Sequence, residues 1–312
     1  MPSYQKTLIR SCSFSGHGLH SGEAVKMKIS PAPPDHGIVF QRQDLPEKPL
    51  IKADLAHVVS TTRGTIIGNA HIEIMTVEHL MATFYALGIT NALVSINAKE
   101  VPIMDGSAQE FADKLSRNVK EQDRFQTLYT IAKPLKLIFH DSSLTIKPSQ
   151  NFRLTVTIDF EGTILPRTAR LNHFADFTEH FAPARTFCFD DELIALKKQG
   201  LIKGGNADNA IVFARSSSEN DKQKRSFAID EKESIASEQY GVLNTSLRFK
   251  NEAARHKLLD FLGDIGLFNF PIAAEMEVFR PGHEVNIHFA KQLKKLLIPN
   301  DHASLATSEF IS

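Results

Sequence analysis

Alternation of apolar and polar residues marks several strands along the chain. Residues 24–29 read AVKMKI, in which every second side chain is apolar, as in a strand with one exposed face. Residues 91–97 form a second short candidate strand, and the segments 144–149 and 152–160 repeat the alternation. Strand patterns therefore occur in both halves of the chain.

Helical spacing lies between these strands. In residues 76–87 the apolar side chains recur at intervals of three and four; Thr76 can cap this helix and Gly88 can end it. Ser107 and Glu110 have the spacing of a capping box at the start of another helix. Further helices are predicted over residues 108–115, 190–199 (ended by Gly200) and 252–268.

This recurrence of strands and helices predicts an α+β fold with two domains. The charged stretch 116–124 is the best boundary, which gives an N-terminal domain of residues 1-122 and a C-terminal domain of residues 123-298. Residues 299-312 are then a tail. The polar segment 216–238 is expected to be a long exposed loop.

Composition narrows the function. The chain has 312 residues, and its 36 basic side chains balance 36 acidic ones, so no overall field favours nucleic acid. Affinity for an anionic ligand must come from a local cluster. Cys12 and Cys188 are the two cysteines, too few for a disulfide framework, and they suit a reducing compartment. With neither a signal-peptide pattern nor a transmembrane segment in the sequence, we expect a cytoplasmic protein.

The segment RHKLLDFLGDIGLF carries the clearest candidate chemistry. On a helix, His256, Asp260 and Asp264 fall at i, i+4 and i+8 on one face, and Lys257 flanks them. Their neighbours are apolar, so the stripe is buried, and buried charges require partners. A zinc ion bound by His256 and Asp260 meets this requirement. An ion-pair network with Lys257 and Arg255 meets it equally well.

A third metal ligand has to come from another segment. The helix that begins TVEH offers His79, with Glu78 beside it as a general base towards water that the zinc activates. The order of these two residues differs from the H-E-x-x-H and H-x-x-E-H motifs of metalloproteases. By itself the Glu-His pair also fits a surface or capping role. It supports a metal site only as the missing partner of His256 and Asp260.

His283, which follows a Pro-Gly turn, is a candidate general acid, and Asp264 can orient it. A polar loop histidine is the competing interpretation.

Five separated blocks of the sequence resemble one known family. They read TVEHLMATFYALGITNALVSINAKEVPIMDGSA, ARTFCF, GGNADNAIVF, RFKNEAARHKLLDFLGDIGLF and GHEVN. Together they are similar to the UDP-3-O-acyl-N-acetylglucosamine deacetylases of lipid A biosynthesis (the LpxC family), over residues 8–297. The resemblance implies two similar domains, each a β-sheet layered with α-helices, with the active site between them. It also implies zinc-dependent removal of the acetyl group from UDP-3-O-(3-hydroxyacyl)-N-acetylglucosamine.

The resemblance also implies a role for each matching residue. The zinc ligands are His79, His256 and Asp260. The general base is Glu78 and the general acid His283, held by Asp264.

Four more residues, and one segment, receive roles in the same way. Thr186 is expected to polarise the amide carbonyl and Phe187 to contact the sugar, while Lys257 and Arg280 are expected to face the phosphates or the oxyanion. The acyl chain is expected in an apolar passage around residues 187–202. Arginine at position 280 departs from the lysine that is common there, and the segment 216–238 is an insertion with no family role.

Two other functions remain open at this point. One is a zinc amidohydrolase of the same fold that acts on another acylated sugar. The other is an interaction module with a structural metal, although structural zinc usually has four protein ligands, rich in cysteine. The family resemblance also leads us to expect a monomer.

Overall fold

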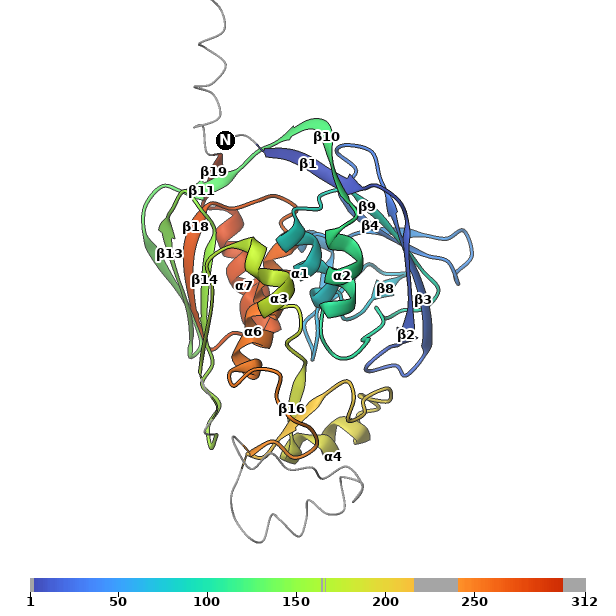
Figure 1. The fold of residues 1–312 in the computed structure, drawn as a ribbon, viewed down its shortest axis with the longest axis vertical. Coiled ribbons are helices and arrows are strands. Elements are labelled where there is room, and N and C mark those ends of the chain that lie inside the picture. The colour runs from blue at the N-terminus through green and yellow to red at the C-terminus, as the bar shows by residue number, and fades with distance from the viewer. Residues whose placement is uncertain (1–2, 164, 166, 216–240, 300–312) are drawn as a thin grey trace, which may run out of the picture.

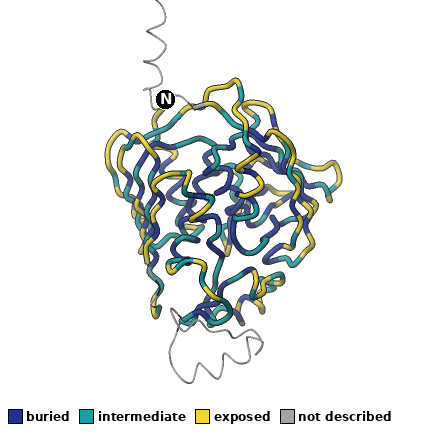
Figure 2. The backbone as a smooth tube through the Cα atoms, in the orientation of Figure 1, coloured by how far each residue is buried: buried dark blue, intermediate teal, exposed yellow. Residues whose placement is uncertain are grey.

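The computed structural model describes residues 3–163, 165, 167–215 and 241–299. Two five-stranded sheets form the outer layers and the helices lie between them (Figure 1). The backbone of this central helical region is largely buried, whereas the exposed segments lie mostly at the periphery (Figure 2). The α+β class predicted from the sequence is confirmed.

The elements of the first half are β1 (Ser3–Leu8), β2 (Cys12–His17), β3 (Ala24–Pro31), β4 (Ile38–Arg42), β5 (Leu50–Lys52), β6 (Val58–Ser60), β7 (Ile66–Gly68), β8 (Glu73–Ile74), α1 (Glu78–Leu87), β9 (Ala92–Ile96), α2 (Gln109–Ser116) and β10 (Val119–Gln126).

Those of the second half are β11 (Tyr129–Ile131), β12 (Leu135–Phe139), β13 (Ser142–Pro148), β14 (Arg153–Thr157), β15 (Thr168–Leu171), α3 (Phe177–His180), β16 (Phe187–Phe189), α4 (Asp190–Lys198), β17 (Ile211–Phe213), α6 (Glu252–Gly266), β18 (Ala274–Phe279), α7 (His283–Lys294) and β19 (Leu297–Pro299).

The two large sheets have the same topology. Their strand orders are β2-β3-β9-β4-β5 and β12-β13-β18-β14-β15, and in each sheet only the third and fourth strands of that order run parallel. A helix precedes the central strand in both halves, α1 before β9 and α6 before β18, and another helix follows it. The fold is thus a repeated unit, in agreement with the expectation of two similar domains, each a β-sheet layered with α-helices.

Each repeat carries an insertion before its central helix. In the first, β6, β7 and β8 form a small three-stranded sheet; in the second, β16 and β17 pair in parallel, with α4 between them. Both insertions contribute residues to the site described below.

Strand β3 shows how the sequence pattern positions the core. Its burial alternates along the strand, with Val25, Met27 and Ile29 at most 2% exposed and the intervening lysines at the surface. Burial of such side chains contributes about 1.5–3 kcal/mol each.

Helices α1 and α6 pack against each other at the centre of the molecule. Both are buried over most of their length, because apolar side chains surround almost the whole helix rather than one stripe. Gly263 and Gly266 on α6 allow close contact, since a Cβ on Gly263 would lie 2.0 Å from the carbonyl oxygen of Glu78. This contact sets the relative position of the helices that carry the candidate ligands.

Two predicted helix caps are wrong. The cap of α1 is Val77, whereas Thr76 has a positive φ of 58° and its hydroxyl donates to Glu100. Ser107 and Glu110 form no capping box, because Ala108 is the N-cap of α2 and the Ser107 hydroxyl donates to Asp105. The predicted end of α1 at Gly88 is confirmed by its left-handed backbone, with φ 70°.

The charged stretch 116–124 is not a linker, because most of it belongs to β10, which pairs with β1. The boundary predicted after residue 122 falls within this strand, and the division into 1-122 and 123-298 stays a prediction. The polar segment 216–238 lies outside the described residues, as does the tail beyond Pro299, which itself ends β19. In the described part of the chain, every helix is too short or too polar to cross a membrane.

Candidate metal centre and active site

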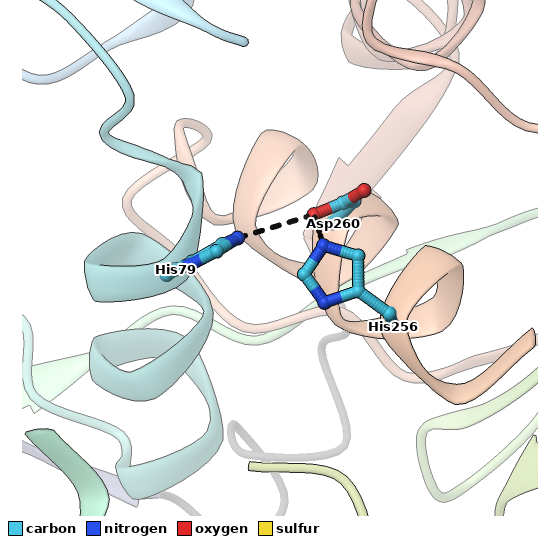
Figure 3. Close-up of side chains that lie close together, drawn as sticks. All are labelled: His79, His256 and Asp260. Carbon is cyan, nitrogen blue, oxygen red and sulfur yellow. Dashed lines mark ion pairs between the residues drawn. The ribbon is translucent and has the colours of Figure 1, made fainter. Parts of the chain in front are cut away.

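Three predicted ligands meet where α1 and α6 pack together. His79 lies in the first turn of α1, and His256 and Asp260 lie one turn apart on α6 (Figure 3). Asp260 Oδ1 is 3.3 Å from His256 Nε2 and 3.7 Å from His79 Nε2. One ligand atom from each residue lies within 4.8 Å of the others, and all three side chains are buried. This group can hold a metal ion.

The chemistry of the three side chains fits a cation. Asp260 Oδ1 is buried without a hydrogen-bond partner, and an orphaned buried carboxylate oxygen requires a positive neighbour. His256 Nδ1 lies 3.0 Å from the Ala184 carbonyl oxygen. A carbonyl can only accept, so Nδ1 carries the hydrogen and Nε2 presents its lone pair towards Asp260 and His79.

Electrostatics keep these side chains in the ligating form. Burial lowers the pKa of His79 to about 3 and lowers that of His256, so both imidazoles are neutral. Burial by itself would raise the pKa of Asp260, but His256 and Lys257 outweigh it and hold that pKa far below its usual range. Neutral imidazole and ionised carboxylate are the forms that bind metals.

Glu78 precedes His79 in α1 and lines the same cavity as the three metal-site residues. Its carboxylate is 3% exposed, and Oε2 accepts the backbone N–H of Thr65 at 2.9 Å. Burial raises the pKa of Glu78 to about 7. A carboxylate with this pKa is suited to accept and release a proton near neutral pH.

His283 begins α7 and is held by Asp264. Its Nδ1 lies 3.0 Å from Asp264 Oδ2, so Nε2 is directed towards Glu78 Oε1, 3.8 Å away, and Asp260 Oδ2, 3.9 Å away. Burial would lower the pKa of His283, but Asp264 and Glu78 raise it to about 9. The ring therefore carries a proton that it can donate.

The three metal-site residues, Glu78 and His283 line one cavity of about 340 Å³, with Thr186, Phe187 and Lys257 in its wall. A second cavity of about 360 Å³ adjoins it and is bounded by the inserted segment β16-α4-β17. The two cavities share four lining residues, which are Leu19, Arg63, Thr186 and Phe187. Leu193, Leu196, Ile202 and Val212 give the second cavity a largely apolar wall.

The structure thus brings together most of the residues predicted from the sequence. Lys257 lies at the cavity, but its ammonium group donates to Asp260 Oδ2 at 2.8 Å. Arg280 is not among the residues that line the cavity, and its guanidinium donates to Asp159 Oδ2 at 2.7 Å. The role predicted for Arg280 therefore has no geometric support here and stays a prediction.

Two fully buried residues of the site were missed at the sequence level. The Thr65 hydroxyl donates to Asp264 Oδ1 at 2.5 Å, and Asn286 Nδ2 donates to Asp264 Oδ2 at 2.9 Å. Asn286 belongs to the GHEVN block, one turn after His283, and this spacing was a usable signal. Thr65 is 199 positions from Asp264, and no local pattern connects them.

A three-residue His/Asp metal group beside a buried carboxylate and a His–Asp pair is a site of the metallohydrolase class. Sequence comparison makes this specific. The model of the UDP-3-O-acyl N-acetylglycosamine deacetylase family matches residues 5–231 and 228–295, and the chain belongs to this family.

Curated relatives agree with the family match. A bifunctional enzyme LpxC/FabZ of Bacteroides thetaiotaomicron is 40% identical over 298 residues, which cover 93% of this chain and 64% of the relative. The UDP-3-O-acyl-N-acetylglucosamine deacetylase of Myxococcus xanthus is 38% identical, covering 90% of this chain and 83% of the relative. That of Thermodesulfovibrio yellowstonii is 36% identical, covering 93% and 91%. The chain therefore spans under two thirds of the bifunctional relative and most of the other two.

Proposed function

We propose that the protein hydrolyses the N-acetyl group of UDP-3-O-(3-hydroxyacyl)-N-acetylglucosamine to the free amine and acetate, as a step of lipid A biosynthesis. The observation that carries this proposal is the convergence of the metal group, Glu78 and His283 on one cavity that adjoins an apolar passage. Family membership supplies the substrate class.

Glu78 and His283 divide the proton transfers of amide hydrolysis between them. Glu78, an acceptor at the cavity wall, takes a proton from the attacking water. The water oxygen bonds to the acetyl carbonyl carbon, and the C–N bond breaks as His283 donates its Nε2 proton to the nitrogen. The nitrogen departs as the free amine of the sugar, and the acetyl group leaves as acetate. Asp264 keeps the His283 ring in the orientation and tautomer that this donation needs.

His79, His256 and Asp260 would hold the metal, for which we propose Zn²⁺, because two imidazoles and one carboxylate are a typical catalytic zinc set. When bound, the ion would supply Lewis acidity. Three protein ligands rather than four favour catalysis over a structural metal.

The second cavity is suited to the acyl chain. Its wall includes Leu193, Leu196 and Ile202, within the segment 187–202 in which the passage was expected. Thr186 and Phe187 border both cavities, so they would contact the sugar between its acetamide and its acyl group. Lys257, a cation at the cavity, is proposed to face the oxyanion or the phosphates.

We also propose a cytoplasmic location and a monomer. Both cysteines are free thiols, which suits a reducing compartment.

The decisive experiment measures acetate release from the acylated UDP-sugar by the purified protein, before and after chelation, with the metal content measured in parallel. We expect release that chelation abolishes and one equivalent of Zn²⁺ restores. UDP-N-acetylglucosamine without the acyl chain serves as the control substrate. Activity on another acylated sugar alone would support the related amidohydrolase instead, and activity unaffected by chelation would exclude the metal role.

A further inference from the structure

A network of hydrogen bonds behind the catalytic cavity links the candidate base to the candidate acid. Its centre is Thr65, which lies just before β7 in the insertion of the first repeat and is fully buried. The residues that line the two cavities do not include it. Thr65 therefore acts on the reaction only through its neighbours.

The backbone of Thr65 holds Glu78. The N–H donates to Glu78 Oε2 at 2.9 Å, and the carbonyl accepts the N–H of Val77 at 3.2 Å. Gly64 makes this approach possible, because a Cβ there would lie 3.0 Å from Glu78 Oε1. One carboxylate oxygen is thus fixed on the peptide, and Oε1 is left on the side of His283.

The side chain of Thr65 holds Asp264. Its hydroxyl donates to Oδ1 at 2.5 Å, while His283 Nδ1 and Asn286 Nδ2 both use Oδ2, at 3.0 and 2.9 Å. A carboxylate can only accept, so the hydroxyl hydrogen is committed to Oδ1 and the imidazole hydrogen points mainly to Oδ2. The Thr65 hydroxyl oxygen is a longer second contact of His283 Nδ1, at 3.3 Å. The carboxylate therefore has a single orientation, set from both ends.

We propose that Thr65 is a positioning residue that aligns Glu78 through its backbone and His283 through its hydroxyl bond to Asp264. The inference rests on the hydrolase function proposed above. Loss of the hydroxyl leaves Oδ1 buried without a donor and frees the carboxylate to turn away from His283. Because Thr65 does not reach the cavity, substrate binding is unaffected.

The test compares Thr65→Val, which has nearly the same shape but lacks the hydroxyl, with Thr65→Ser, which keeps it. We expect Thr65→Val to lower kcat roughly ten- to hundredfold, as for loss of a hydrogen bond to a charged group, with KM and metal content unchanged. Thr65→Ser should restore most of kcat. In the Asp264→Asn background, Thr65→Val should add much less than its loss in the wild type, because the shorter bond of the hydroxyl is the one to Asp264 and the contact with His283 is longer.

Thr7→Val is the matched control. Thr7 is 2% exposed, and its hydroxyl donates to the carbonyl of Asn91, the residue before β9, at 2.7 Å. Neither residue lines the catalytic cavity. The variant should lose stability while its kcat stays normal. An equal fall in kcat for Thr7→Val and Thr65→Val, a change in KM alone, or additive losses with Asp264→Asn would overturn the proposal.

A second readout does not depend on turnover. In full-length, metal-free protein labelled with 15N-histidine, the Nδ1–H resonance of His283 should shift or broaden in Thr65→Val and return in Thr65→Ser. An unchanged resonance would refute the link through Asp264. Wild-type protein that released no acetate would count against the deacetylase proposal, while this resonance would still test the role of Thr65.

Discussion

Gly263 on α6 lies directly against the backbone of Glu78 on α1. A Cβ at position 263 would be 2.0 Å from the Glu78 carbonyl oxygen and 2.7 Å from its carbonyl carbon, distances at which the two helices must separate. Since α1 carries His79 and α6 carries His256 and Asp260, this contact controls whether three ligands can reach one ion.

Gly263→Ala should therefore weaken metal binding as well as stability. Overpacking of a core typically costs about 1–3 kcal/mol, and here the displaced element carries a ligand. We expect a lower thermal midpoint and a higher Kd for Zn²⁺, measured by calorimetry and metal titration. Gly266→Ala, whose Cβ would lie 3.1 Å from the Met81 carbonyl, is the milder control. Metal affinity unchanged in Gly263→Ala would refute the argument.

The variants Glu78→Gln and His79→Ala should distinguish the role of a general base from that of a metal ligand. Glu78→Gln keeps the metal and the shape of the side chain but removes the proton acceptor, so kcat should fall about 10²–10⁴-fold. His79→Ala should lose the metal. Elemental analysis and acetate release distinguish the two variants. Near-normal turnover in Glu78→Gln would show that another group is the base.

Narrowing the second cavity should affect long acyl chains selectively. Ala210 lines this cavity, so Ala210→Phe should lower kcat/KM roughly tenfold for a long-chain substrate, because the ring takes up apolar space, and leave a short-chain analogue unaffected. Ala195→Phe, at an exposed position on α4, is the control. Equal losses on long and short chains would argue against an acyl site.

The ion pair of Asp105 with Arg248 links the two halves of the chain, and its contribution to stability should depend on pH. Asp105 Oδ2 lies 2.8 Å from Arg248 Nη2. Burial would raise the pKa of Asp105, but hydrogen bonds from Ser107 and Arg248 outweigh it and lower that pKa. A lowered pKa in the folded state adds stability above the unfolded value of about 4, and this stability is lost as the pH falls through the folded value.

Asp105→Asn, which keeps an oxygen acceptor for Ser107, should therefore lower the thermal midpoint at pH 7. The difference from wild type should shrink as the pH falls below about 4, where the wild-type carboxyl is also neutral. Thermal scans over this pH range measure it. A difference that persists unchanged in acid would show that the charge of Asp105 is not the cause.

The sequence predicted the parts of the site that local spacing encodes. His256 and Asp260 share a helix face one turn apart, and Glu78 and His79 are adjacent in sequence. Both patterns can therefore be recognised without knowledge of the fold. Thr65 could not be found in this way, since its partners Glu78 and Asp264 lie 13 and 199 positions away. Contacts of this kind exist only once the two repeats are packed together.

The predicted cap at Thr76 failed for a related reason. Its hydroxyl finds a buried acceptor in Glu100, which also accepts the N–H groups of His20 and Ser21. The hydrogen bond to this buried carboxylate outweighed the local preference of threonine for a helix start. The repeat itself was hidden because the two halves share strand order and helix placement, which backbone geometry preserves while side chains differ.

The matching topology of the two halves has a consequence for how the catalytic centre forms and how it can fail. Equivalent helices contribute unequally: α1 gives one imidazole and the base, and α6 gives an imidazole, a carboxylate and the aspartate behind the acid. Neither half contains the complete set of residues, so the site can form only where both halves are present and packed together. A metal ion held by His79, His256 and Asp260 would tie the two halves to each other, and its removal should lower the free energy of unfolding of the whole protein.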